Sequence, residues 1–149
     1  MQSIPMQICN NAENCNNFYI EKLFHILRSF LCVMVFCLEN VFEEEPGMLT
    51  EIVRQVNDPR IRMCLDVGHV NAYSKISVME WLESCVDLTE HFHIHNNDTR
   101  RDAHGQLMDG TIPMKELLAA IEEKCPNATL TLELMNAEPS VRWLLEEQL

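Results

Sequence analysis

The chain has 149 residues, 47% hydrophobic and 23% charged, a balance that fits one folded domain and excludes an intrinsically disordered chain. Its 23 acidic and 11 basic residues give a formal net charge of −12 at pH 7, which disfavours a passive nucleic-acid-binding protein. The longest strongly apolar stretch, residues 30–38, is too short for the ~20 residues of a membrane-spanning helix. The seven cysteines form an odd number without a C-x-x-C pair, and no secretory signal with a cleavage site is evident. We therefore expect reduced thiols and a cytoplasmic protein, with Cys37 and Cys64 buried in strands.

The first half of the chain begins without regular structure. Residues 1–17 include an Asn-rich run and are assigned to no element. Apolar spacing predicts a helix over residues 18–30, and a strand follows directly in VFCLEN, residues 35–40. The next helix opens at Pro46 and Gly47, carries an i, i+3, i+4, i+7 apolar stripe, and ends at Asn57.

The second half continues the same alternation. An apolar-polar alternation predicts a strand over residues 61–67, and Ser77 with Glu80 forms a capping box ahead of a helix. A further strand spans HFHIH, residues 91–95, and Pro113 stands at the first turn of the next helix. The last strand and a short final helix are expected over residues 129–134 and from residue 139.

Regular alternation of strands and helices with short crossovers favours an α/β fold with parallel strands and helices outside. The alternation of side chains alone would also fit a half-solvated antiparallel sheet. In parallel α/β folds, functional groups gather at the carboxyl ends of the strands. We therefore expect polar residues at those ends to form a site.

Four potential metal ligands end four of the expected strands: Glu39, Asp66, His93 and Glu133. A strand-end acid taken alone is more often a helix cap or a salt-bridge partner than a ligand. Four such residues on four strands instead indicate a metal site. His95 lies on the same face as His93 and is an alternative ligand in a register shifted by two residues.

Four motifs together resemble the later strands of the xylose isomerase-like TIM barrel superfamily: LENVFEEEP, CLDVGH, HIHNND followed by DAH, and LELM. This superfamily includes sugar isomerases, keto-sugar epimerases and endonuclease IV. The resemblance covers roughly residues 18–149. It implies a (β/α)8 TIM barrel, of which a complete copy has eight strands and about 250 residues. The chain is therefore expected to be a partial barrel domain, residues 18–149, that lacks the early strands.

The resemblance also implies roles for individual residues. The epimerase branch holds a divalent metal with residues that correspond to Glu39, Asp66, His93 and Glu133, and the ion would be Mn²⁺, Mg²⁺, Co²⁺ or Zn²⁺. Glu39 and Glu133 would also act as the general acid and base. His69 corresponds to a residue that contacts substrate in epimerases and a second metal in endonuclease IV. A further metal pair of the endonuclease branch corresponds to Asp102 and His104.

The function implied is that of a metal-dependent sugar or sugar-phosphate isomerase or epimerase, which moves a proton through an enediolate. Two alternatives stay open: an endonuclease IV-like zinc phosphodiesterase and a non-catalytic barrel remnant. The net charge weighs against nucleic acid as the partner, and a small sugar or sugar phosphate is the expected substrate. A homodimer or a partner chain would complete the barrel and cover exposed strand edges.

Overall fold

A computed structural model describes residues 20–22 and 34–149 of the chain. The segment 1–17, expected to lack regular structure, lies outside the described residues, and so does most of the helix predicted over residues 18–30. Within the described residues, no helix combines the length and the apolar character needed to cross a membrane.

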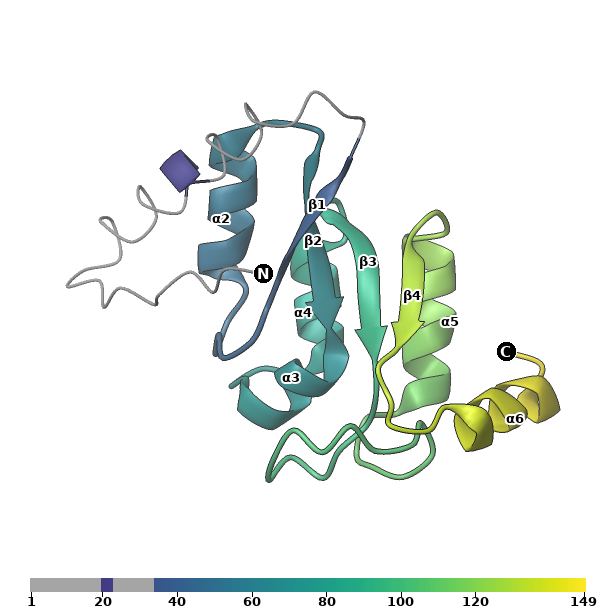
Figure 1. The fold of residues 1–149 in the computed structure, drawn as a ribbon. Helices are drawn as coiled ribbons and strands as arrows, with labels where there is room; N and C mark the ends of the chain where they lie inside the picture. The colour runs from purple at the N-terminus through teal and green to yellow at the C-terminus, as the bar shows by residue number, and fades with distance from the viewer. Residues whose placement is uncertain (1–19, 23–33) are drawn as a thin grey trace.

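A four-stranded parallel sheet forms the centre of the described part. Its order follows the sequence, and its strands are β1 (Phe36–Glu39), β2 (Ile61–Asp66), β3 (Thr89–Ile94) and β4 (Thr129–Leu132). All four arrowheads in Figure 1 point to the same edge of the sheet. The prediction of parallel strands is confirmed, and the antiparallel alternative is excluded for these strands.

Among residues 34–149, five helices connect or follow the strands. They are α2 (Gly47–Val56), α3 (Val67–Tyr73), α4 (Val78–Cys85), α5 (Met114–Lys124) and α6 (Glu138–Glu147). Helices α4 and α5 lie behind the sheet in Figure 1. The core fills the space between sheet and helices, where Met63, Leu65, Phe92 and Ile94 are fully buried alongside Trp81 of α4.

The capping box, the helix-ending asparagine and the helix-starting proline lie at helix ends, as predicted. Ser77 accepts a hydrogen bond from the Glu80 backbone N–H, and the Glu80 carboxylate accepts one from the Ser77 N–H, which completes the capping box of α4. Asn57 ends α2 in the left-handed conformation with a φ of 48°, a position where asparagine is well tolerated. Pro113 directly precedes α5.

Helix α3 is an element that the sequence analysis missed. The predicted strand over residues 61–67 ends at Asp66, and α3 begins at the next residue. Asp66 is the N-cap of α3, since its carboxylate accepts a hydrogen bond from the His69 N–H at 2.8 Å. Asp66 therefore ends β2 and caps α3. Because no loop separates the two elements, the apolar periodicity did not reveal where the strand ends and the helix begins.

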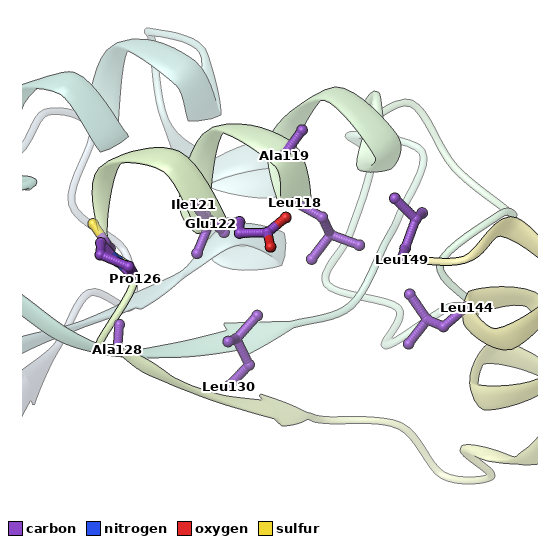
Figure 2. Close-up of a pocket in the computed structure, with 10 residues that line it drawn as sticks. Leu118, Ala119, Ile121, Glu122, Pro126, Ala128, Leu130, Leu144 and Leu149 are labelled. Carbon is purple, nitrogen blue, oxygen red and sulfur yellow. The ribbon is translucent and has the colours of Figure 1, made fainter.

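One predicted burial position is wrong, and a leucine of β4 is exposed at the edge of the described sheet. Cys37 is exposed, whereas Cys64 is buried as expected. Leu130, on the apolar face of β4, is 47% exposed. It lines an apolar groove between α5, β4 and α6 together with Leu118, Leu144 and Leu149 (Figure 2). A homodimer or a partner chain that covers this edge stays a prediction.

Candidate metal centre

The four strand-end residues named from sequence converge at the carboxyl edge of the sheet. One ligand atom from each of Glu39, Asp66, His93 and Glu133 lies within 4.8 Å of the others. His93 Nδ1 is the centre of the group: it lies 3.0 Å from Glu39 Oε1, 3.2 Å from Glu133 Oε2 and 3.6 Å from Asp66 Oδ2. We call this set the carboxylate cluster.

This convergence depends on the curvature of the sheet. Glu39 ends β1 and Glu133 follows β4, and these are the two outermost strands of the described sheet. Strands in a flat sheet would stand roughly 14 Å apart over three spacings of about 4.8 Å. A barrel-like curl instead brings both carboxylates to the imidazole of His93.

The carboxylate cluster carries negative charge that no Lys or Arg of the described residues neutralises. Within this part of the chain, the ion pairs of Glu39, Asp66 and Glu133 are all with histidines. Glu133 Oε2 is buried without a hydrogen-bond partner among the same residues. Three carboxylates and one imidazole with an unsatisfied oxygen fit a divalent cation of the Mn²⁺, Mg²⁺, Co²⁺ or Zn²⁺ type.

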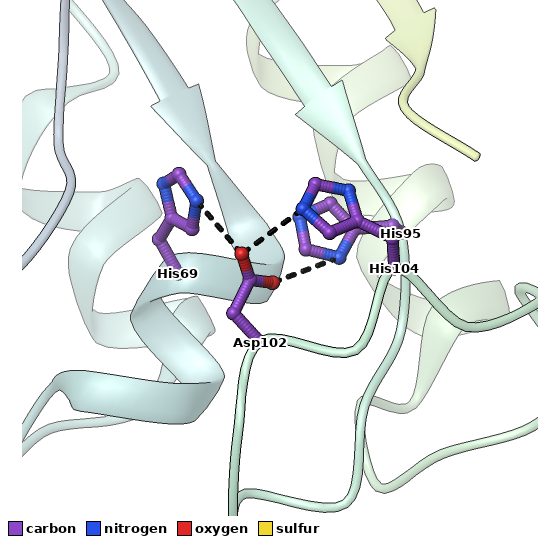
Figure 3. A group of neighbouring side chains, drawn as sticks. All are labelled: His69, His95, Asp102 and His104. Carbon is purple, nitrogen blue, oxygen red and sulfur yellow. Dashed lines mark ion pairs between the residues drawn. The ribbon is translucent and has the colours of Figure 1, made fainter. Parts of the chain in front are cut away.

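A second group lies beside the first and is rich in imidazole. His69, His95, Asp102 and His104 each offer one ligand atom within 4.8 Å of the others. In Figure 3 the three rings surround the carboxylate of Asp102. His104 Nε2 lies 3.0 Å and His69 Nε2 lies 3.2 Å from Asp102 Oδ2, and His95 Nδ1 lies 3.6 Å from Oδ1. We call this set the histidine cluster.

The elements that hold the histidine cluster all follow strands. His69 belongs to α3, His95 follows β3 directly, and Asp102 and His104 lie in the loop between β3 and α5. His104 has a φ of 46°, in the left-handed region that residues other than glycine adopt infrequently. The rings of His95 and His104 stack at 4.2 Å between centroids.

Two buried asparagines fix the backbone around the clusters. The side chain of Asn40 donates to the Asp66 carbonyl at 2.9 Å and accepts from the Asp66 N–H at 2.8 Å, which locks the ends of β1 and β2 together. Asn96 donates to the carbonyls of Leu107 and Ile112, within the loop that carries Asp102. Both asparagines are buried and position the ligands' backbone.

Burial and hydrogen bonds shift the pKa values of several cluster residues in opposite directions. Burial raises the pKa of Asp66. Hydrogen bonds from the His95 ring and the His69 N–H lower it by more than burial raises it, so the pKa lies below its ordinary value. Burial lowers the pKa of His69 and His104, yet the pKa of both ends above the ordinary value. The backbone carbonyls of Asn40 and Glu133 and the nearby carboxylates cause this rise.

His95 is the cluster member that the sequence analysis did not assign. It was named only as a substitute for His93, whereas the structure places the two residues in different clusters. Residues two apart on a strand point to the same face of the sheet, so the H-x-H spacing places both rings near the same edge. Contacts with other segments decide which cluster each ring joins: His93 Nδ1 lies 3.0 Å from Glu39 Oε1, whereas His95 Nδ1 lies 3.6 Å from Asp102 Oδ1.

The sequence comparison decides the family. A sequence model of the xylose isomerase-like TIM barrel matches residues 10–148. The chain belongs to the xylose isomerase-like TIM barrel family. A curated protein of Methanocaldococcus jannaschii, described as uncharacterized, is 26% identical over 98 residues, which are 65% of this chain and 33% of that protein. The four-stranded sheet described above is thus part of a (β/α)8 barrel.

Solved structures support the same fold. A D-tagatose 3-epimerase-like protein superposes with a TM-score of 0.78 at 22% identity, over 97% of this chain and 58% of its own. A Thermus thermophilus protein soaked with ZnCl₂ gives 0.72 at 20% identity, over 95% of this chain and 57% of its own. D-psicose 3-epimerase from Clostridium cellulolyticum H10, solved with D-tagatose, superposes with a TM-score of 0.68 at 17% identity. The match covers 85% of this chain and 44% of that one. The chain therefore spans about half the length of these solved relatives.

Proposed function

We propose that this chain carries the metal-binding half of a sugar or sugar-phosphate isomerase or epimerase. The observation that carries the proposal is the convergence of Glu39, Asp66, His93 and Glu133 on one point at the carboxyl edge of a family barrel. The expected substrate is a small polyhydroxy ketone or aldehyde, since epimerases stand among the structural relatives. The net charge of −12 weighs against a polyanionic substrate such as DNA.

The four residues divide the proposed work between binding and proton transfer. Glu39, Asp66, His93 and Glu133 would hold one divalent cation, which when bound would polarise the oxygens of the sugar. Asp66 is held in place by the His69 N–H and the His95 ring, so it serves as a rigid ligand. Glu39 and Glu133 approach from opposite edges of the described sheet and are 34% and 41% exposed, so substrate can reach them.

Glu133 and Glu39 would act as the general base and the general acid. One carboxylate removes the proton from the carbon next to the carbonyl, and the other delivers a proton to the same carbon from the opposite side. Their approach to His93 Nδ1 from β1 and from the end of β4, the two outer strands of the described sheet, supports these roles. His69, a substrate contact or a second-metal ligand by family resemblance, directs Nδ1 to the Asn40 carbonyl and Nε2 to Asp102. These contacts favour His69 as a metal ligand over His69 as a substrate contact.

Solvent exchange of the substrate proton tests the proposal directly. Purified full chain loaded with Mn²⁺ or Co²⁺ is incubated in D₂O with a panel of ketoses and their phosphates, and deuterium at C-2 and C-3 is followed by NMR. We expect incorporation that Glu133→Gln abolishes and that Glu123→Gln, an exposed change on α5, leaves intact. Absence of exchange across the panel, in a sample shown to hold the metal, would contradict the function.

An endonuclease IV-like phosphodiesterase is the second candidate, favoured by one observation. Asp102 and His104, which the resemblance pairs in the endonuclease branch, do lie together and beside His69. The test is nicking of an abasic-site DNA duplex by zinc-loaded chain at low salt. Cleavage that Asp102→Asn removes would support this candidate over the isomerase, and intact DNA alongside sugar proton exchange would exclude it.

A further inference from the structure

A third group of potential ligands lies on the face of the sheet opposite the helix-packed core. Cys64 of β2 and His91 of β3 are direct partners in the parallel ladder, and His93 is the next residue of β3 on the same face. One ligand atom from each of the three, a sulfur and two ring nitrogens, lies within 4.8 Å of the others. The family resemblance assigns no role to Cys64 or His91. We call this set the thiol cluster.

The Cys64 thiol is buried and is not a nucleophile. Cys64 is a free cysteine and is only 3% exposed. Burial raises the pKa of its thiol above the ordinary value, and the negative charges of Glu39 and Asp66 raise it further. A reactive cysteine needs the thiolate, which this thiol does not form at neutral pH. A soft cation can instead replace the thiol proton, because metal binding releases protons from its ligands.

The ring of His91 is held in place by two hydroxyl groups of β4. Its Nδ1 lies 2.6 Å from Thr129 Oγ1, and its Nε2 lies 3.1 Å from Thr131 Oγ1. A hydroxyl either donates or accepts, so one ring nitrogen can keep its hydroxyl partner while the other offers its lone pair to a cation. Both threonines are exposed, and the released hydroxyl can bond to water. Metal-binding histidines in proteins are commonly oriented by such an oxygen partner.

We propose that Cys64, His91 and His93 bind a thiophilic cation such as Cu⁺ or Cd²⁺. One thiolate and two imidazoles are soft or borderline ligands, which select such ions over Mg²⁺ and Mn²⁺. The carboxylate cluster offers mainly oxygen atoms and therefore has the opposite preference. The assignment does not depend on the proposed isomerase activity, because it concerns ion binding alone.

The two ions would compete, because His93 belongs to both the thiol cluster and the carboxylate cluster. Its Nδ1 lies 3.0 Å from Glu39 Oε1 and 3.2 Å from Glu133 Oε2. A cation bound to Cys64 and the His93 ring takes the one imidazole of the carboxylate cluster. Two cations beside the same ring would also repel each other at this short range. A thiophilic ion should therefore weaken divalent cation binding at the carboxylate cluster.

Cadmium titration of the full chain tests the assignment. Cd²⁺ bound to a thiolate absorbs in the ultraviolet through sulfur-to-metal charge transfer, so the absorption that is lost in Cys64→Ser reports this cysteine alone. We expect that part of the absorption to saturate at one Cd²⁺ per chain. His91→Gln keeps the thiol and should weaken this Cd²⁺ binding about tenfold or more. An absorption unchanged by Cys64→Ser, or a Cd²⁺ affinity unchanged by His91→Gln, would overturn the proposal.

Matched controls separate the thiol cluster from the other cysteines. Cys85→Ser changes a second buried cysteine, on α4, and should leave the Cys64-dependent absorption intact. Cys37→Ser changes the exposed cysteine of β1 and should also leave it intact. Loss of that absorption in either control would overturn the three-residue assignment.

Manganese competition tests the sharing of His93. Chain loaded with Mn²⁺ is titrated with Cd²⁺, and the released Mn²⁺ is followed by electron paramagnetic resonance. We expect release from the unmutated chain at about tenfold lower Cd²⁺ than from Cys64→Ser, where Cd²⁺ can act only by direct replacement. Equal release from both would overturn the shared role of His93. Absent Mn²⁺ binding would contradict the carboxylate cluster, and the cadmium titration would still decide the thiol cluster.

Discussion

The carboxylate cluster and the histidine cluster lie at the same edge of the sheet but offer different sets of side chains. The first has three carboxylates around one imidazole, and the second has three imidazoles around one carboxylate. Glu39 and Glu133 of the first are 34% and 41% exposed, whereas His95 of the second is fully buried. Each cluster nevertheless combines a buried and a partly exposed member, since Asp66 of the first is fully buried and His104 of the second is 32% exposed.

The difference follows from where each ligand stands in the chain. The carboxylate cluster takes its side chains from the ends of four parallel strands, which the curvature of the sheet brings together. The histidine cluster takes them from α3, the residue after β3, and a loop. Strand ends therefore supply the carboxylate cluster, and the segments that leave those strands supply the histidine cluster. Asp66 is the residue through which one would affect the other.

Asp66→Asn should have the largest effect, because it acts on both clusters. Asparagine keeps the N-cap of α3 but removes the charge and one acceptor oxygen that His95 and the first cation would use. We expect cation affinity to fall on the order of 100-fold at the carboxylate cluster and about 10–100-fold at the histidine cluster. Calorimetric titration with Mn²⁺ and then Zn²⁺ measures both. A normal zinc affinity would show that the clusters are independent.

Removal of zinc should have the second-largest effect and lower the stability of the fold. A ligand that binds only the native state at 100 times its Kd stabilises that state by about 2.7 kcal/mol. We expect urea unfolding of chelator-treated chain to begin earlier, and zinc at that concentration to restore the difference. The carboxylate-disabled Glu39→Gln/Glu133→Gln chain should show the same gain. A gain confined to the unmutated chain would instead place the stabilising ion in the carboxylate cluster.

Gly68→Ala should act on the histidine cluster more than on the carboxylate cluster. A Cβ at residue 68 would overlap the His95 ring, and overpacking of this kind costs about 1–3 kcal/mol. We expect zinc affinity to fall about tenfold, a loss of roughly 1.4 kcal/mol, with a smaller change in Mn²⁺ affinity. Gly47→Ala is the matched control, because a Cβ there meets no atom within 4 Å. Equal losses in both variants would refute the steric explanation.

Ser77→Ala should give the smallest effect and leave both clusters unchanged. Loss of a serine N-cap costs about 0.5–2 kcal/mol of stability, measured by urea unfolding. The Ser77 hydroxyl and N–H lower the pKa of Glu80, so their contribution is present above its unfolded pKa near 4.5 and is lost as pH falls through the folded value. The cost of Ser77→Ala should therefore shrink from pH 7 toward pH 3. A change in metal affinity would mean that α4 is coupled to the clusters.

Local signals in the sequence predicted most of the secondary structure of residues 34–149. Strand alternation, the capping box at Ser77 and the turn at Asn57 depend on residues a few positions apart, and each appears where it was expected. Helix α3 was missed because Asp66 both ends β2 and caps the helix. The prediction that Cys37 is buried was wrong because burial depends on which surfaces lie opposite a strand.

The sequence by itself determined which side chains end the parallel strands, because the alternation of a strand and the order of the elements fix that much. It therefore named Glu39, Asp66, His93 and Glu133. Only the tertiary structure decided that His95 joins the histidine cluster and not the carboxylate cluster. That division depends on atoms whose residues stand 29 positions apart, such as Asp66 and His95, and on hydrogen bonds that fix each ring nitrogen. Sequence spacing carries no information about either.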